Sequence, residues 1–419
     1  MNERDVGEVV YQTIDLMSAQ GVREFSVPPA TLIGPGAIAR IGEAIAARGM
    51  ARVFVVIDAM LDQAGLAEGM FRSLRRHAVE TVVCRQKPGE PESETVEAIA
   101  VRLAEARCDG VVAFGGGSTL DAVKGAVILA ANPGWSVRRM AEVLEDSSGE
   151  RARMRRRLPF IAVPTTAGTG SEATNVTVII DSAERVKHLI VHADMIPDLA
   201  VIDACLTLRV PPHFTAATGI DALTHAIEAY VATRATPLTR ALAYRAMTLI
   251  GEALPVAVGQ GSDVAARESM MLAAYMAGIA FSNAGLGLSH AMAHQIGPAY
   301  GIAHGVANAI LLPPVMDFNQ LVCKRAFAEI GHALSGRLLE PPQAIEHVRR
   351  LIAEIGLPTN LRDAGGKVGD FADFARAALE DPSLKTNPRT ASPAQIVEIY
   401  RHALERREDG KQETGGEMD

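Results

Sequence analysis

The chain has few aromatic residues and few cysteines, and these two features bear on how it packs and on its redox environment. Phe, Trp and Tyr make up 4% of its 419 residues, although 48% are hydrophobic, which indicates close packing by small side chains. The four cysteines are scattered and show no Cys-x-x-Cys spacing, so a reduced, cytoplasmic setting is favoured over a disulfide framework. They are Cys84, Cys108, Cys205 and Cys323.

The sequence also lacks a basic surplus, a secretory signal and a long apolar run. Its 41 Lys and Arg are outnumbered by 49 Asp and Glu, and the net charge of −8 argues against nucleic acid and anionic membrane as partners. The polar, acidic start argues against a secretory signal. No apolar run is expected to be long enough to span a bilayer. We therefore expect a cytoplasmic protein with no nucleic-acid or membrane partner.

Two halves with different patterns are predicted, residues 1–209 and 210–419. The first alternates short apolar runs with helical patterns, which indicates an α/β domain with a parallel sheet covered by helices. The second has long Ala-, Leu- and Met-rich patterns, such as 238–258 and 265–281, which predict an all-α domain starting near Pro211. Residues 405–419 are expected to be a disordered tail. The predicted strands are Val53–Ile57, Glu80–Cys84, Val111–Phe114, Phe160–Val163, Val176–Ile180 and Leu199–Ile202.

One helix of the first half is predicted in more detail. Ser93 is expected to cap it, and Val96, Ile99 and Leu103 form one apolar stripe along it.

Histidines number only 11, yet several fall at four-residue spacings in the second half. Asp221 and His225 are four apart, His290 and His294 are four apart, and His304 follows. Residues at i and i+4 share one face of a helix, so each pair offers two donors to one ion. Imidazoles with a carboxylate suit Fe(II) or Zn(II) rather than Ca(II) or Mg(II). The alternative is a set of ordinary helical histidines, but two pairs and a further histidine favour a metal centre.

Two polar turns follow predicted strands in the first half. Gly115, Gly116, Gly117 and Ser118 open a helix that contains Asp121. Glycines there let the backbone approach a ligand, and the helix N-terminus offers amides to a pyrophosphate. The turn departs from the GxGxxG fingerprint because its sixth residue is Leu.

The second turn, residues 164–172, offers the hydroxyl groups of Thr165, Thr166 and Thr169 to phosphate or ribose. Each turn alone has a purely structural alternative as a helix start. Together, at the carboxyl ends of strands, they favour a dinucleotide ligand.

Asp58 directly follows the predicted strand Val53–Ile57. From a strand end its carboxylate can accept hydrogen bonds from the 2′- and 3′-hydroxyls of the adenosine ribose, and it would repel the 2′-phosphate of NADP. The alternative is that Asp58 only caps the segment Ala59–Leu61. We expect a preference for NAD.

Together these motifs resemble the iron-containing (group III) alcohol dehydrogenases, in the superfamily of glycerol dehydrogenase and dehydroquinate synthase. The resemblance runs from about Phe25 to Leu404 and is most specific from Val201 to Glu228. The Asn387-Pro388-Arg389 stretch is similar to the family's closing segment. The resemblance implies a Rossmann-like first domain that binds NAD(P) and an all-helical second domain that binds a metal, Fe(II) or alternatively Zn(II).

The same resemblance implies roles for single residues. Asp221, His225, His290 and His304 match the metal ligands, and His294 matches a histidine beside the metal that does not bind it directly. Residues matching cofactor contacts are Lys187, Thr165, Thr166 and Thr169. The chain departs from the family at Glu90-Pro91-Glu92, where Asn-Pro-Thr is usual, and this bears on an amide contact to the cofactor. It also departs at Ala303, where proline is usual, and at Pro298, where a small residue is usual.

The implied activity is hydride transfer between a small primary alcohol, or its aldehyde, and NAD. An apolar, Ala-rich surface makes a homo-oligomer the expected state rather than a monomer. His294 is expected to relay a proton, or else only to orient a ligand. Three alternatives remain open: a hydroxyacid–oxoacid transhydrogenase that retains its nicotinamide, a non-redox enzyme like dehydroquinate synthase, and a metal- or NAD-sensing binding protein.

Overall fold

The protein is described here by a computed structural model. It describes residues 23–404 except 88, 146–153, 182–185 and 368. The tail predicted for residues 405–419 lies outside the described residues.

A six-stranded parallel sheet forms the centre of the first half, in the order β1-β8-β5-β4-β2-β3. Its inner strands are nearly continuous runs of Val, Ile, Phe and Ala because both faces are covered. Five of the six predicted strands belong to it. The strands are β1 (Thr31–Ile33), β2 (Arg52–Asp58), β3 (Glu80–Gln86), β4 (Gly110–Gly115), β5 (Phe160–Pro164) and β8 (Leu199–Ile202).

The sixth predicted strand does form, but its placement in the parallel sheet was wrong. β6 (Val176–Asp181) pairs antiparallel with β7 (Val186–Val191) in a separate two-stranded sheet. Its side chains alternate between buried and half-buried positions, as they do when only one face is covered. Two strands were not predicted, namely β7 and the three-residue edge strand β1.

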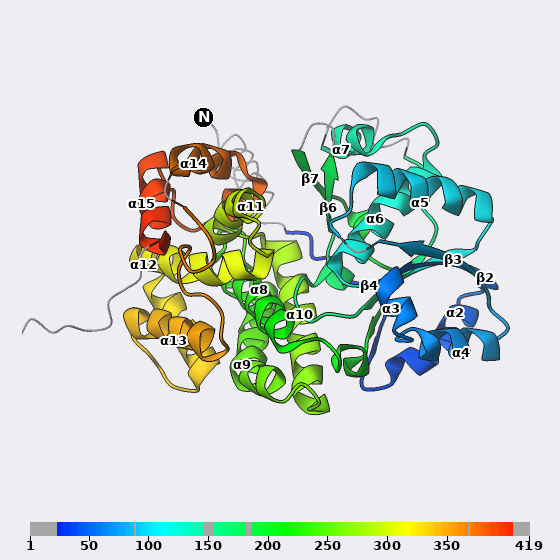
Figure 1. Cartoon of the computed structure of the whole chain (residues 1–419), viewed down its shortest axis with the longest axis horizontal. Helices are drawn as coiled ribbons and strands as arrows, with labels where there is room; N and C mark the ends of the chain where they lie inside the picture. Colours follow the sequence, from blue (N-terminus) through cyan, green and yellow to red (C-terminus); the bar gives the residue numbers. More distant parts are fainter. Residues whose placement is uncertain (1–22, 88, 146–153, 182–185, 368, 405–419) are drawn as a thin grey trace, which may run out of the picture.

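Helices cover both faces of the parallel sheet, which Figure 1 shows in its right half. Successive side chains of a strand point to opposite faces, so Phe54 and Val56 pack under one helical layer while Val53 and Val55 pack under the other. The first layer has α5 (Ser93–Ala106), α6 (Gly117–Ala131) and α7 (Val137–Glu145). The second has η1 (Ala37–Arg40), α2 (Ile41–Ala46) and α4 (Glu68–Arg76), and the short α3 (Ala59–Gln63) follows β2.

The stripe predicted for α5 is confirmed, since Val96, Ile99 and Leu103 are buried. The predicted cap is wrong. Glu92 occupies the N-cap position, and the Ser93 hydroxyl instead donates to the carbonyl of Ile180 in β6. Ser93 therefore joins this helix to the two-stranded sheet.

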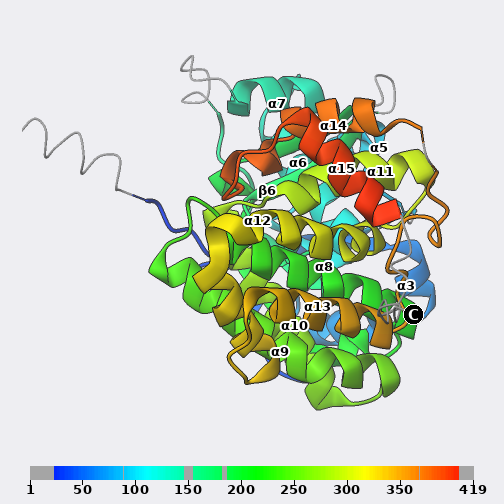
Figure 2. The same ribbon diagram turned by 90° about the vertical axis from the view of Figure 1, so that its left-hand side faces the viewer.

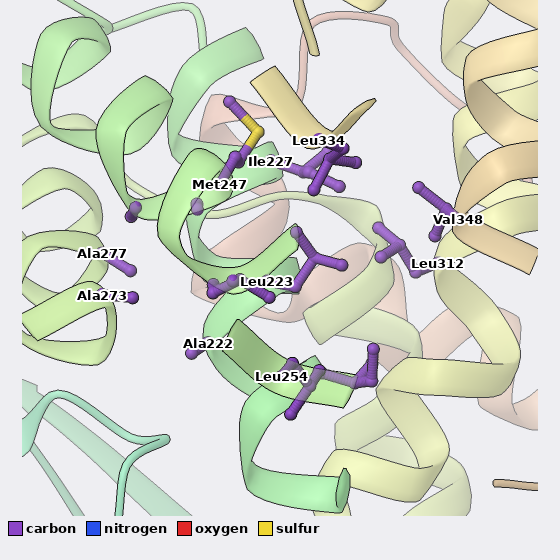
Figure 3. Close-up of a cluster of buried hydrophobic side chains, with 14 of the residues drawn as sticks. Ala222, Leu223, Ile227, Met247, Leu254, Ala273, Ala277, Leu312, Leu334 and Val348 are labelled. Atoms are coloured by element: carbon purple, nitrogen blue, oxygen red, sulfur yellow. The ribbon is translucent and has the colours of Figure 1, made fainter. Parts of the chain in front are cut away.

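The second half is helical, and α8 (Pro212–Val231) lies at its centre. Ala222, Leu223 and Ile227 of α8 meet side chains of the surrounding helices, as Figure 3 shows. Figure 2 shows α12 running beside α8, and the two helices are in contact. The remaining elements are α9 (Pro237–Gly259), α10 (Val264–Ala284), α11 (Leu288–Tyr300), α12 (His304–Ser335), α13 (Pro341–Glu354), α14 (Phe371–Glu380), η6 (Pro382–Thr386) and α15 (Pro393–Leu404).

Two of these helices correct the expectation that no apolar run is long enough to cross a membrane. By length and composition alone, α9 and α12 qualify. In the fold, 44% of the apolar window in α9 and 61% of that in α12 is buried inside the protein. Their apolar residues contribute to the core around α8, and this packing accounts for their composition.

Candidate active site

Three of the four predicted metal ligands come together between α8, α11 and α12. Asp221, His290 and His304 each offer a donor atom, and these atoms lie within 4.8 Å of one another. Asp221 Oδ1 is 3.4 Å from His304 Nε2 and 3.8 Å from His290 Nε2. The i, i+4 spacing predicted the helices correctly, but the cluster draws one residue from each of three helices.

The side-chain amide of Asn308 lies among these three donor atoms. Its nitrogen is 2.9 Å from Asp221 Oδ1 and 3.2 Å from both His290 Nε2 and His304 Nε2. The carboxylate oxygen accepts, and both ring nitrogens accept in the neutral tautomer that carries its proton on Nδ1, so all three atoms can face one cation. Asn308 was not predicted, although it follows His304 by four residues and shares its face of α12.

His225 lies beside this group rather than within it. Its ring stacks on His290, with 4.6 Å between ring centroids, and on Phe281 from the other side at 4.4 Å. Its buried Nδ1 has no hydrogen-bond partner among the described residues. Burial lowers the pKa of His225 to about 4, although the Asp221 carboxylate opposes this shift. The ring is therefore neutral at pH 7, and a ring nitrogen can act as a metal ligand.

Glu228 contacts His290 at Nδ1, the ring nitrogen opposite the one that faces Asp221. Its Oε2 is 2.6 Å from His290 Nδ1, and its Oε1 accepts a 2.7 Å hydrogen bond from the Ser289 amide. Burial disfavours the charged ring, but Glu228 and Asp221 outweigh it and raise the pKa of His290 to about 9. Asp221, His225 and Glu228 fall at i, i+4 and i+7, a spacing from which Glu228 could have been found.

Burial would raise the pKa of Asp221, but the surrounding histidines hold it well below its usual range. Asp221 is thus a carboxylate at neutral pH. It supplies the negative charge that the cluster needs to hold a cation.

His294 lies next to the cluster and has a carboxylate partner of its own. Its Nδ1 is 2.8 Å from Asp381 Oδ2, and its ring stacks on His304 with 5.3 Å between centroids. Burial would raise the pKa of Asp381, but the hydrogen bond from His294 more than compensates, and the pKa is lowered. Asp381 lies 87 residues away in sequence, so no local spacing pointed to it.

The predicted nucleotide residues lie at the carboxyl ends of three neighbouring strands. Asp58 ends β2, Gly115 ends β4, and Thr165 follows β5 with its amide donating to the Gly115 carbonyl. A Cβ on Gly115 would come 2.4 Å from Thr119 Oγ1, and one on Gly117 would come 2.7 Å from the Thr169 side chain, so both positions require glycine. The N-terminus of α6 has no side-chain cap, which leaves its first amides for a ligand.

Three of the predicted cofactor residues already have hydrogen-bond or ion-pair partners within the protein. Asp58 Oδ1 accepts hydrogen bonds from the amides of Met60 and Leu61, so it caps α3. Asp121 accepts hydrogen bonds from the Ser171 hydroxyl and from the Val178 amide, so it links the second turn to strand β6. Lys187 forms a 2.9 Å ion pair with Glu90, the residue that departs from the family pattern. Ser118, Thr166 and Thr169 are half-buried on the turns themselves.

The second turn packs directly against the helices of the metal cluster. A Cβ on Gly168 would come 2.7 Å from Cβ of Thr218, which lies one helical turn before Asp221 on α8. The backbone of Gly168 lies close enough to the His225 ring to oppose the lowering of the His225 pKa. Gly170 has φ +62°, and a Cβ there would lie 2.7 Å from Gly278 on α10. The second turn and the cluster of Asp221, His290 and His304 are therefore contiguous.

The residues present fit a divalent metal. Three donor atoms converge, Glu228 holds the far nitrogen of His290, and His225 keeps a buried nitrogen without a partner among the described residues. A carboxylate with imidazoles is a donor set for Fe(II) or Zn(II). Beside a parallel sheet with a glycine-rich turn at a strand end, this is the architecture of a metal-dependent, dinucleotide-using oxidoreductase.

The chain belongs to the iron-containing alcohol dehydrogenase family. The model described as iron-containing alcohol dehydrogenase matches residues 28–204. The model of the Fe-containing alcohol dehydrogenase family, C-terminal, matches residues 215–404. These matches lie on either side of Pro211, while the exact division at residue 209 stays a prediction.

Individual relatives agree with this assignment. The chain is 51% identical over 398 residues to a probable alcohol dehydrogenase, EutG, of Salmonella typhimurium. This match covers 95% of the present chain and 99% of the relative. It is 37% identical over 387 residues to an NAD-dependent methanol dehydrogenase of Bacillus methanolicus, covering 91% and 99%. A solved 1,3-propanediol oxidoreductase matches with TM-score 0.86 and 36% identity, covering 91% and 100%. The predicted family, fold class, alcohol oxidoreductase activity and use of NAD and iron are confirmed at the level of the family.

Proposed function

We propose that this chain interconverts a small primary alcohol and its aldehyde by hydride transfer to and from NAD. The observation that carries the proposal is the direct packing of the threonine-rich turn on α8, next to Asp221 and His225. A nicotinamide held by the turns at the strand ends would lie against the metal cluster. Hydride transfer needs this proximity because it occurs only between atoms in contact.

Asp221, His290 and His304 would hold the ion, with His225 as the fourth donor. When bound, a divalent ion supplies Lewis-acid stabilisation of the negative charge that develops on the substrate oxygen. Burial of Asp221, His225 and His290 excludes water from the same place, which strengthens every electrostatic interaction there.

His294 would move the proton of the alcohol. Asp381 occupies its Nδ1, so its Nε2 is the nitrogen that exchanges a proton. The side chain is 18% exposed, whereas that of His290 is 1% exposed, so His294 can also reach solvent. A purely orienting role for His294 would leave the pH dependence of turnover unchanged in a His294→Gln variant.

On the nucleotide side, the turn of Gly115, Gly116, Gly117 and Ser118 would hold the pyrophosphate at the start of α6. The hydroxyls of Thr165, Thr166 and Thr169 would contact the cofactor from the second turn. Asp58 has one oxygen engaged in capping α3, and its other oxygen would accept from the ribose. Asp121 and Lys187 would act through their partners, Ser171 and Glu90, rather than by direct contact.

We further propose a cytoplasmic homo-oligomer with no nucleic-acid or membrane partner. The net charge of −8 opposes binding to polyanions. β1 forms an edge of the sheet, and Phe25, Val27 and Ile33 near it are between 38% and 52% exposed. An apolar sheet edge is stable when a second copy covers it. Light scattering coupled to gel filtration measures the oligomeric state directly.

The activity is tested by anaerobic assay of short-chain aldehydes with NADH after loading with Fe(II) or Zn(II). We expect aldehyde-dependent loss of NADH absorbance with at least one aldehyde, abolished by a chelator. No oxidation of added NADH, with nicotinamide retained through gel filtration, would replace this proposal with the transhydrogenase. Binding of metal and NAD without turnover of any substrate would indicate a sensing protein.

A further inference from the structure

Helix α11 begins without a side-chain cap of its own. Gly287 occupies its N-cap position, so the first amides must find partners elsewhere in the chain. The Leu288 amide donates to Asn387 Oδ1 at 3.1 Å, and the Ser289 amide donates to Glu228 Oε1 at 2.7 Å. One cap thus comes from α8 and the other from the segment before α15.

The Glu228 carboxylate does two things at once. While Oε1 caps α11, Oε2 lies 2.6 Å from Nδ1 of His290, one residue further along that helix. The carboxylate is buried, with a side-chain exposure of 5%, so both bonds form away from water. Capping the helix and holding the ring are therefore one rigid arrangement.

The chemistry of a carboxylate decides which ring nitrogen carries the proton. Carboxylate oxygens accept hydrogen bonds, and Oε1 already accepts from the Ser289 amide, so Nδ1 of His290 is the donor to Oε2. In the neutral ring that binds a metal, the lone pair then lies on Nε2, which is the atom that faces Asp221 and Asn308. A ring turned to the other tautomer would aim a proton at the cluster.

The close approach of Glu228 also explains the glycine at the start of α11. A Cβ on Gly287 would lie 2.9 Å from Glu228 Oε1 and 2.9 Å from Asn387 Oδ1. Any larger residue at this position would displace both caps. The local backbone is thus adapted to the carboxylate.

We propose that Glu228 is a positioning residue that fixes the tautomer and direction of His290 for metal binding, by sharing its carboxylate between that ring and the α11 N-terminus. This inference rests on the proposed function, because it takes His290 to be a ligand.

The test is Glu228→Gln, which keeps the shape of the side chain and replaces one acceptor by a donor. The amide oxygen can still cap Ser289, but its NH2 now faces Nδ1 and selects the tautomer with the proton on Nε2. We expect the affinity for Zn(II) and Co(II), measured by chelator competition, to fall about 10- to 100-fold. The melting temperature should change little because the cap survives.

Asn387→Ala is the matched control. It removes the neighbouring cap on Leu288 and leaves the His290 contact in place, so it should lower the melting temperature and leave Zn(II) affinity within about 3-fold of wild type. Equal loss of affinity in both variants would show a merely structural role for Glu228 and overturn the inference.

A second measurement needs no variant. In the Zn(II)-loaded wild type, 15N NMR of labelled histidine should show a slowly exchanging proton on Nδ1 of His290. A proton on Nε2 would overturn the inference. If the wild type binds no metal at all, the proposed function fails instead, whereas wild-type binding with an unaffected Glu228→Gln variant would refute only the role of Glu228.

Discussion

Single side chains in the site owe their direction to partners outside the predicted motifs. Glu228 orients His290, Asp381 orients His294, and Asn308 spans the donor atoms of the cluster. Such outer partners fix ring orientation and donor character, and their loss weakens a site without removing a ligand. The ligands alone therefore describe only part of the centre.

Replacing His290 with Ala should remove most of the metal and nearly all of the activity. Two donors on the cluster would remain beside His225, and Glu228 would be left as a buried carboxylate without its ring partner. Elemental analysis of purified protein gives the occupancy. His213→Ala, an exposed histidine on α8, is the control and should keep full metal. Full occupancy in the His290 variant would refute its assignment as a ligand.

Asp58→Gly should relax the preference for NAD over NADP. The change removes the carboxylate that would repel the 2′-phosphate. It also removes the cap on α3, but glycine at an N-cap costs only about a few tenths of a kcal/mol relative to aspartate. Loss of stability is thus not expected to obscure the result. Steady-state kinetics with both cofactors decide it, and an unchanged ratio of kcat/KM would count against Asp58 as the selector.

How much of the site the sequence predicted depends on the distance between partners. Asp221 and His225, or His290 and His294, lie one helical turn apart, so spacing alone predicted the pairs. Asp381 contacts His294 across 87 positions, and only the fold brings the two together. The polar turns were found because glycine and threonine cluster locally, but the inward direction of Asp121 depends on the neighbouring turn.

Among the larger elements, the threonine-rich turn connects the proposed nucleotide site with the proposed metal site. It begins at the end of β5, continues through η3 (Ser171–Ala173), and packs on α8 and α10. Beneath it lie buried charges, with Lys124 donating to the backbone and hydroxyl of Thr174 and to the Val176 carbonyl. Its position therefore depends on backbone fit and on buried electrostatics.

Gly170→Ala should destabilise the protein and weaken NAD binding. The residue has φ +62°, and its new Cβ would meet Gly278 Cα at 2.7 Å and the Ala274 carbonyl at 2.9 Å, both backbone atoms that cannot move aside. Strain and overpacking together should cost about 2–5 kcal/mol. Chemical denaturation and NAD titration measure both effects.

Gly134→Ala is the control for this prediction. It carries the same kind of backbone strain at φ +89° with nothing within 4 Å, so it should cost only about 1 kcal/mol. Equal losses in the two variants would show that the contact with α10 is unimportant.

Glu172→Gln should flatten the decline in stability between about pH 4.5 and 7. Burial raises the pKa of Glu172 from 4.5 to about 7, so the folded state holds the proton more tightly than the unfolded state. The resulting contribution is present below pH 4.5 and is lost as pH rises to about 7, on the order of 3 kcal/mol in total. Denaturation at several pH values tests this, and an identical slope in the variant would contradict it.

For the molecule as a whole, the pattern of the sequence predicted the architecture because the first half alternates short apolar runs with helical patterns, whereas the second half has helical patterns alone. Continuous β-branched runs such as Val53–Ile57 predicted a doubly covered parallel sheet, and the change at Pro211 predicted the start of helices. The composition did not separate β6 from that sheet, because an apolar run does not specify its pairing partner. Nor did the composition show that apolar residues of α9 and α12 pack into the core around α8.

In the proposed function, hydride passes directly between substrate and nicotinamide across the junction of the two halves. This transfer is tested most directly by reducing an active aldehyde with NADH that carries deuterium at the transferred position of the nicotinamide ring. Mass spectrometry of the alcohol should show one deuterium on the carbinol carbon per turnover, and none from deuterated water at that carbon. An alcohol without deuterium from the nicotinamide would rule out direct hydride transfer.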